Sequence, residues 1–276
     1  MGAISDFHYQ LECPHLPNLI ISDLIAMIKA FAKQTLSAFG YTLMREHPGF
    51  RPEWVPIHDK RINLLEILIK LELFSRETFK FVQIGANDGV QADPLSVIIR
   101  KYRLKGIMIE PIPKIFARLE SNYADVDGLD FQNLAITVSG DYGQVPFYTL
   151  QSVDKQVDHR LSGFATTSKE KIYAAQKLTP NATEVATIEV DYQSVAYFVK
   201  ANQLRELSLL VTDVEGLDID LVSEFIRLGV LPNIIYMEIL DQSPARQQQI
   251  MEILISSGYV IGGNISDLIA YKSDRL

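Results

Sequence analysis

Residues 79–89 read Phe-Lys-Phe-Val-Gln-Ile-Gly-Ala-Asn-Asp-Gly, a short apolar run followed by a turn between two glycines. An apolar run of this length predicts a buried strand, and residues 94–102 after it have the apolar spacing of a helix. Strands and helices alternate in this way from here to the C-terminus. The pattern predicts a mostly parallel sheet covered by helices on both faces, which is a doubly wound α/β fold.

The remaining elements follow from the same periodicity. Strands are predicted at residues 106–110, 131–138, 207–212, 234–239, 259–261 and 268–271, and helices at 63–74, 113–123, 218–228 and 245–256. Gly262-Gly263-Asn264 separates the last two strands by so short a loop that they are expected to form a hairpin. The sheet should therefore close with one antiparallel strand.

The first 75 residues stand apart from this alternation and form a predicted N-terminal helical extension, so that the α/β domain spans residues 76–276. Apolar residues near helical spacing predict an amphipathic helix within residues 19–44. We expect it to pack against the rest of the protein; contact with a membrane surface or with a second copy of the chain is the alternative. No run of 18 uncharged apolar residues occurs, so no transmembrane segment is expected.

The composition limits the partners and the compartment. The 26 Lys and Arg against 34 Asp and Glu give a net charge of −8, which argues against a nucleic-acid partner, because duplex phosphates require a basic surface. A single cysteine, Cys13, excludes a disulfide framework and a zinc site built from several cysteines. The N-terminal residues lack the apolar region of a signal peptide, and we expect the protein in the cytoplasm.

The turn after the first strand is the first candidate binding element, because ligands of open α/β sheets bind at the carboxyl ends of the strands. Gly85 and Gly89 allow a tight turn and a close approach of the main chain to a ligand. A dinucleotide fingerprint would need further glycines where this chain has Asn87 and Val90, so the sequence disfavours NAD. The alternative is that the turn is purely structural.

Glu110 ends the second predicted strand, 21 residues after Gly89. An acid in this place of a doubly wound fold accepts hydrogen bonds from both hydroxyl groups of a ribose. The alternative is an acidic residue on a loop, but a carboxylate that closes an apolar strand is less common. The sequence therefore favours a nucleoside ligand.

A third cluster holds Asp213, Glu215 and Asp218 directly after the apolar run at residues 207–211, and Glu238 ends the next strand. Neighbouring parallel strands would bring Asp213 and Glu238 together at one sheet edge. Such a pair suits a divalent cation or a shared proton, and the residues leave both open without assigning a metal. Alternatively, Glu215 or Asp218 caps the helix that starts near residue 218.

These motifs together resemble the FkbM family of S-adenosylmethionine-dependent methyltransferases over roughly residues 79–240. The segments that carry the resemblance are Gln-Ile-Gly-Ala-Asn-Asp-Gly (83–89), Ile-Glu-Pro-Ile-Pro (109–113), Asn-Leu-Ala-Ile (133–136), Asp191 in Val-Asp-Tyr, Thr-Asp-Val-Glu-Gly-Leu-Asp (212–218) and Tyr-Met-Glu (236–238). The resemblance implies the class I methyltransferase sheet, S-adenosylmethionine as cofactor, and methyl transfer to a hydroxyl group of a sugar, polyketide or glycolipid.

The resemblance also implies a place for each candidate residue. The turn after the first strand would meet the methionine part of the cofactor through Gln83, Gly85, Ala86, Asn87 and Gly89. Glu110 would hold the ribose, and residues from Asn133 to Ala135 would border the adenine. Asp213 and Glu215 would lie at the methyl-transfer face, where Asp213 would also contact the cofactor.

Two positions depart from the family pattern. The family usually has Asp where this chain has Gln83, a position that implies contact with the amino group of the cofactor, and it commonly has Lys where this chain has Thr212. A glutamine accepts through its amide oxygen but brings no charge. At Gln83 the expected consequence is weaker cofactor binding or a shifted pose of the cofactor, and at Thr212 it is an unusual acceptor.

We therefore predict an O-methyltransferase that acts on a hydroxyl group of a small molecule or glycan: a carbohydrate, a glycolipid or a natural product. Because a sulfonium activates its own methyl group, the enzyme mainly aligns the acceptor oxygen and removes its proton. Asp213 is the first candidate for this base, and His159, in the polar stretch 158–164 that is expected to form a lid, is the second. The alternative function is a non-catalytic cofactor-binding or interaction domain.

Overall fold

A computed structural model describes residues 63–75, 78–91, 93–152, 165–177, 183–214, 216–240, 242–264 and 266–272. Several predicted features lie outside these residues: the amphipathic helix within 19–44, the polar stretch with His159, and Glu215. The described residues belong to one unit that runs from residue 63 to residue 275. The account below concerns this unit.

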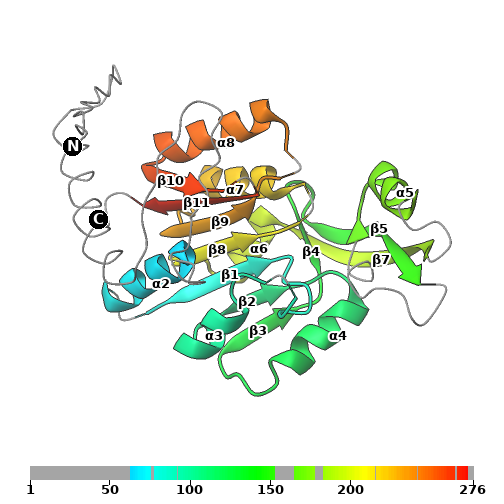
Figure 1. The fold of residues 1–276 in the computed structure, drawn as a ribbon, viewed down its shortest axis with the longest axis horizontal. Helices are drawn as coiled ribbons and strands as arrows, with labels where there is room; N and C mark the ends of the chain where they lie inside the picture. Colours follow the sequence, from blue (N-terminus) through cyan, green and yellow to red (C-terminus); the bar gives the residue numbers. More distant parts are fainter. Residues whose placement is uncertain are drawn as a thin grey trace, which may run out of the picture. The chain divides into compact units, whose positions relative to one another are not determined.

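The main sheet has seven strands in the order β10-β11-β9-β8-β1-β2-β3 (Figure 1). The strands are β1 (Lys80–Ile84), β2 (Lys105–Ile109), β3 (Leu129–Gln132), β8 (Leu209–Thr212), β9 (Ile234–Glu238), β10 (Tyr259–Gly263) and β11 (Asp267–Lys272). β11 runs antiparallel to both of its neighbours, whereas the pairs formed by β1, β2, β3, β8 and β9 are parallel. The predicted hairpin and the single antiparallel strand are confirmed, and the sheet has the class I methyltransferase order.

Helices cover both faces of this sheet, as predicted (Figure 1). One face carries α2 (Leu64–Ser75), α3 (Ser96–Tyr102) and α4 (Pro113–Asn122), and the other carries α6 (Val195–Ala201), α7 (Asp218–Arg227) and α8 (Pro244–Ser256). Successive side chains of a strand point to opposite faces, so Phe81 packs in the first layer and Val82 in the second. Burial on both faces explains why β1 reads as a continuous apolar run.

A second sheet of four strands, in the order β4-β7-β5-β6, was not predicted. It consists of β4 (Ala135–Thr137), β5 (Tyr142–Ser152), β6 (Ala165–Thr166) and β7 (Thr183–Ser194), with α5 (Lys169–Lys177) between the last two. The strand predicted at 131–138 is therefore divided between β3 of the main sheet and β4 of the second sheet. Most residues of β5 and β7 are half-buried or exposed, which leaves them without the apolar pattern of a core strand.

The helix α2 is joined to the main sheet by a buried carboxylate. Glu72 Oε2 accepts a hydrogen bond from Asn233 Nδ2 at 2.6 Å, and its Oε1 accepts one from the Tyr271 hydroxyl at 3.0 Å. The last helix of the predicted extension thus packs on the α/β domain, while the boundary at residues 75 and 76 stays a prediction. None of the helices among the described residues has the length and apolar character needed to cross a bilayer.

Candidate functional site

A cavity of about 360 Å³ lies at the carboxyl ends of β1, β2, β8 and β9. Its wall is formed by the turn after β1, by the segments after β2 and β8, by the ends of β9 and β11, and by residues of the second sheet. Three of the second-sheet residues are Phe147, Ala165 and Thr166. The cavity therefore occupies the place where this class of sheet binds its ligands, and its size lies in the range of small-molecule sites.

The turn after β1 is held against β2. The main-chain N–H groups of Gly85 and Ala86 both donate to the oxygen of Ile109, at 3.0 and 2.9 Å. Gly85 has a φ of +82° and Asn87 a φ of +49°, backbone conformations that glycine and asparagine tolerate best. Gly85, Ala86 and Asn87 all line the cavity.

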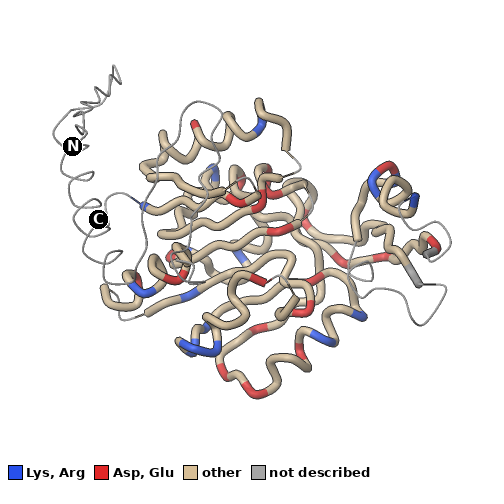
Figure 2. Tube along the Cα trace, viewed as in Figure 1, with Lys and Arg blue, Asp and Glu red and all other residues tan. Residues whose placement is uncertain are grey.

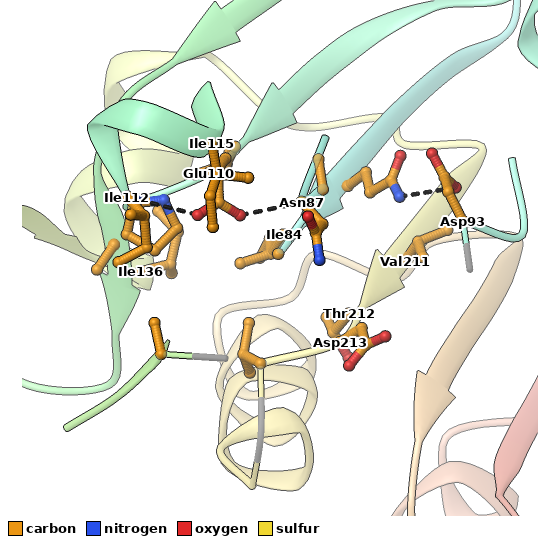
Figure 3. A pocket seen from close by; sticks show the side chains of 18 of the residues that line it. Ile84, Asn87, Asp93, Glu110, Ile112, Ile115, Ile136, Val211, Thr212 and Asp213 are labelled. Atoms are coloured by element: carbon orange, nitrogen blue, oxygen red, sulfur yellow. Dashed lines mark hydrogen bonds between the residues drawn. The ribbon is translucent and has the colours of Figure 1, made fainter. Parts of the chain in front are cut away.

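Glu110 is 5% exposed and lines the cavity (Figure 3). Its Oε2 accepts from the main-chain N–H of Asn87 at 3.0 Å, and its Oε1 accepts from that of Ile112 at 2.9 Å. Burial raises the pKa of this carboxyl group to about 7, although the two N–H donors act in the opposite direction. An ionised carboxylate has about four acceptor sites, so each oxygen keeps one for a ligand hydroxyl.

Sequence reasoning missed Asp93, which contacts Gln83 in the cavity wall. Gln83, which is 3% exposed, donates from Nε2 to Asp93 Oδ1 at 3.0 Å, and the main-chain N–H of Leu95 donates to the same oxygen at 2.7 Å. Burial raises the pKa of Asp93 to about 6. An Asp before a Pro at the start of a helix resembles an ordinary helix start, so the sequence carried no signal for a ligand contact.

The acids at the ends of β8 and β9 lie at one edge of the sheet, as predicted. The register pairs Thr212 with Met237, so Asp213 and Glu238 follow at the same edge, and both line the cavity. The hydroxyl group of Tyr236 lies among them, and its pKa is raised by burial, by Asp267, and by Asp213 and Glu238. Among the described residues, no group of three or more His, Cys, Asp or Glu side chains is placed to hold a metal ion.

Asp218 has a structural role in the turn between β8 and α7. Its carboxylate is buried and accepts from the main-chain N–H groups of Val214 at 3.2 Å and Gly216 at 3.4 Å. It therefore closes the turn that leads from β8 into α7, and burial raises its pKa. This agrees with the alternative that an acid stabilises the start of the helix.

Gly89 and Asn133, two of the expected cofactor residues, do not line the cavity and instead form hydrogen bonds with neighbouring segments. The main-chain oxygen of Gly89 accepts from the Tyr123 hydroxyl at 2.7 Å, and a Cβ atom on Gly89 would lie 2.3 Å from the Tyr123 ring. Asn133 donates from Nδ2 to the main-chain oxygens of Glu110 and Pro111, at 2.8 and 3.1 Å. Ala135 does line the cavity.

The sequence of residues 83–261 matches the Methyltransferase FkbM domain, which is more than half of the chain. The chain belongs to the FkbM methyltransferase family. The resemblance read from the motifs is thereby confirmed, and so is the cofactor of the family, S-adenosylmethionine. No curated protein matches the sequence.

Solved structures of methyltransferases are similar to this FkbM protein at low identity. The FkbM methyltransferase of Methylobacillus flagellatus KT is 13% identical with a TM-score of 0.44; the match covers 70% of this chain and 44% of that protein. Aeropyrum pernix fibrillarin, solved with natively bound S-adenosylmethionine, is 14% identical with a TM-score of 0.38, covering 75% and 73%. A human methyltransferase 10 domain containing protein is 10% identical with a TM-score of 0.39, covering 92% and 98%. Identities and TM-scores this low carry no information about the methyl acceptor of this protein.

The charge of the FkbM domain cavity fits the cofactor. Among the described lining residues Arg118 is the one basic side chain, and the acids are Asp88, Asp93, Glu110, Asp213, Glu238 and Asp267. In the tube view the Lys and Arg positions are spread over separate segments (Figure 2). An acidic cavity attracts a sulfonium cation and repels a pyrophosphate, so these residues suit S-adenosylmethionine and disfavour NAD.

Proposed function

We propose that the protein transfers the methyl group of S-adenosylmethionine to a hydroxyl group of a neutral carbohydrate, glycolipid or natural product. The observation that carries the proposal is the pair Glu110 and Asp213 in one cavity. Glu110 is buried and hydrogen-bonded, as a residue that holds a ribose should be, whereas Asp213 is exposed and accessible to an acceptor. The two carboxylates can therefore serve different steps: the buried one binds the cofactor, and the exposed one removes the proton of the acceptor.

The acceptor side of the cavity favours a polyol over an anion. Asp213, Glu238 and Asp267 line it beside Tyr236, and the second sheet contributes Thr166. Carboxylates accept hydrogen bonds from sugar hydroxyl groups and repel phosphate and carboxylate groups. We therefore expect an uncharged acceptor with several hydroxyl groups.

Asp213 acts as general base in this proposal. S-adenosylmethionine supplies a methyl group already activated by a positive sulfur. The acceptor oxygen bonds to this methyl carbon as the sulfur–carbon bond breaks, and the hydroxyl proton passes to the Asp213 carboxylate. The products are a methyl ether and S-adenosylhomocysteine. Glu215 and His159 remain candidates for assisting this step.

The compartment and the remaining partners are part of the same proposal. A single cysteine in 276 residues suits the reducing cytoplasm. Contact of the amphipathic N-terminal helix with a second copy or with a membrane surface stays a prediction, because those residues lie outside the described part. At Asp213 and Glu238 the choice between a divalent cation and a shared proton stays open, and no metal is assigned.

The test is transfer of labelled methyl from S-adenosylmethionine to a panel of methyl glycosides, run beside their phosphorylated counterparts. We expect methyl ethers of neutral glycosides and none of the phosphates. Asp213→Asn should lower kcat by about 100-fold or more, the usual contribution of a general base, while the Kd for S-adenosylmethionine changes less than about threefold. Full activity of Asp213→Asn would exclude it as the base, and binding of the cofactor with no transfer to any hydroxyl would favour the non-catalytic alternative.

A further inference from the structure

Two buried oxygen atoms of the cavity wall have no hydrogen-bond partner within the described part of the chain: Gln83 Oε1 and Asp93 Oδ2. The two side chains are joined through their other polar atoms, since Gln83 Nε2 donates to Asp93 Oδ1 at 3.0 Å (Figure 3). Both residues line the cavity. A buried acceptor without a donor is costly, and two on one bonded pair indicate a missing donor.

The main chain fixes the orientation of this pair. The N–H of Leu95 donates to Asp93 Oδ1 at 2.7 Å, so this oxygen acts as an acceptor. Turning the Gln83 amide around would place Oε1 against that acceptor in place of the nitrogen. The amide nitrogen must therefore face Asp93, and Oε1 has no donor among the described residues.

The ligand group that would satisfy these two oxygen atoms must donate hydrogen bonds, and the acidic surroundings favour a cation. A carboxylate oxygen and an amide oxygen accept, and the other lining side chains are mostly acidic. A primary ammonium has three N–H donors, and its bond to a carboxylate is among the stronger hydrogen bonds in proteins. A hydroxyl group has one donor and no charge, so it would satisfy one of the two oxygens.

We propose that Asp93, held in place by Gln83, binds the ammonium group in the amino-acid part of S-adenosylmethionine. The proposal rests on this molecule as the ligand of the cavity and not on the nature of the methyl acceptor. In Figure 3 Asp93 and Glu110 lie on either side of Asn87. A ligand with its ribose at Glu110 would pass the Asn87 turn before it reaches Asp93.

The proposal explains how the protein can have Gln83 where the family usually has an Asp. A glutamine there brings no charge of its own, but it orients a carboxylate ten residues further along the chain. Burial raises the pKa of Asp93 to about 6, and an ammonium beside Oδ2 would favour the ionised form. The charge that an acid at position 83 would supply thus comes from Asp93.

The test is calorimetric titration of the full chain with two ligands. S-adenosylmethionine carries the ammonium, whereas 5′-methylthioadenosine has the same nucleoside without the amino-acid part. Asp93→Asn should weaken S-adenosylmethionine binding about 10- to 100-fold, the range for a hydrogen bond to a charged group, and change methylthioadenosine binding less than about threefold. Asp127→Asn is the control, because it removes one charge at an exposed position that does not line the cavity, and we expect less than about a threefold change for either ligand.

Thermal unfolding separates this role from a structural one. In Asp93→Asn the new amide can still accept from Leu95 through its oxygen, and its nitrogen can donate to Gln83 Oε1. We therefore expect the melting temperature of the free protein to stay level or to rise, while selectivity for S-adenosylmethionine falls. Equal losses of affinity for both ligands together with a lower melting temperature would indicate a structural role.

An exchange of the two groups completes the test. The double variant Gln83→Glu with Asp93→Asn has the same shape and charge as the wild type, with the carboxylate and the amide interchanged. It should recover S-adenosylmethionine affinity to within about fivefold of the wild type. Equal losses of both ligands in Asp93→Asn, or no loss of either, overturn the proposal and leave the proposed function standing. Failure of the wild type to bind either ligand overturns both.

Discussion

A Cβ atom on Gly85 would lie 1.9 Å from the main-chain oxygen of Asp213. The loops after β1 and β8 touch at this point, and the main-chain N–H of Asp213 donates to the oxygen of Ile84 at 3.0 Å. Gly85 also has a φ of +82°. One glycine therefore sets the distance between the turn at the cofactor end of the cavity and the proposed base.

Gly85→Ala should lower the free energy of unfolding by about 3 kcal/mol or more, because the added methyl group meets rigid main chain and the backbone conformation disfavours it. Gly229→Ala is the matched control. Gly229 has a φ of +77°, and no atom of the described residues lies within 4 Å of its Cβ position, so we expect a loss of about 1 kcal/mol from the backbone alone. Urea unfolding measures both, and equal losses would mean that the two loops separate freely.

Glu110→Gln should weaken S-adenosylmethionine binding about 30-fold or more. It removes the charge that accepts ligand hydroxyl groups, and it places an amide nitrogen against one of the N–H donors of Asn87 and Ile112. Glu120→Gln, on an exposed position of α4, is the matched control and should bind normally. Titration calorimetry gives both values. Wild-type affinity in Glu110→Gln would show that another residue holds the ribose.

Much of the fold was predictable because the main-sheet strands are buried on both faces. Their apolar runs stand out in the sequence, and the Gly262-Gly263-Asn264 segment correctly indicated a terminal hairpin. Its two glycines are nevertheless paired within β10, so the connection falls between Gly263 and Asp267. The second sheet was missed for the opposite reason. β5 and β7 are long but half-exposed, so apolar and polar residues do not alternate along them clearly enough to identify a strand.

Within the site, residues at strand ends and on the turn directly after β1 could be placed from the sequence, whereas Asp93 could not. Glu110 and Asp213 each follow an apolar strand, and parallel strands that end at one edge must bring such residues together. Asp93 is placed by the path of a loop, and its link to Gln83 depends on side-chain geometry that spacing does not encode. At Gly89 the sequence does not distinguish a glycine needed for packing from one needed for a ligand, and in the structure the Tyr123 ring lies against it.

Glu72→Ala should destabilise the protein by about 3 kcal/mol, because Asn233 and Tyr271 would lose their buried acceptor. Glu66→Ala on the same helix is the control. Glu66 forms a partly exposed ion pair with Lys101, and its loss should cost about 1 kcal/mol or less. Urea unfolding of both variants compares them directly. Similar small losses would mean that α2 contributes little to the sheet and would favour a domain that starts after residue 75.

The stability of the free protein should fall as the pH rises from about 5 to about 8. Burial raises the pKa of Glu110 to about 7 and that of Asp93 to about 6, and it raises the pKa of Asp218 as well. A carboxyl group with a higher pKa in the folded than in the unfolded chain binds a proton on folding between those two values. The stability is therefore present at the lower pH and lost as the pH passes the folded pKa values. Melting temperatures in matched buffers should be about 5 °C higher at pH 5.5 than at pH 8.

Bound S-adenosylmethionine should reverse this trend, because its hydroxyl and ammonium groups favour the ionised forms of Glu110 and Asp93. By linkage, the affinity must then rise with pH over the same window, and the stabilisation by a fixed concentration of ligand must grow. Calorimetric Kd values at pH 5.5 and pH 8 test this, and Asp93→Asn should show a smaller difference than the wild type. A wild-type affinity that is constant between these pH values would mean that neither carboxyl group changes its protonation when the cofactor binds, which contradicts the placement of the ligand between them.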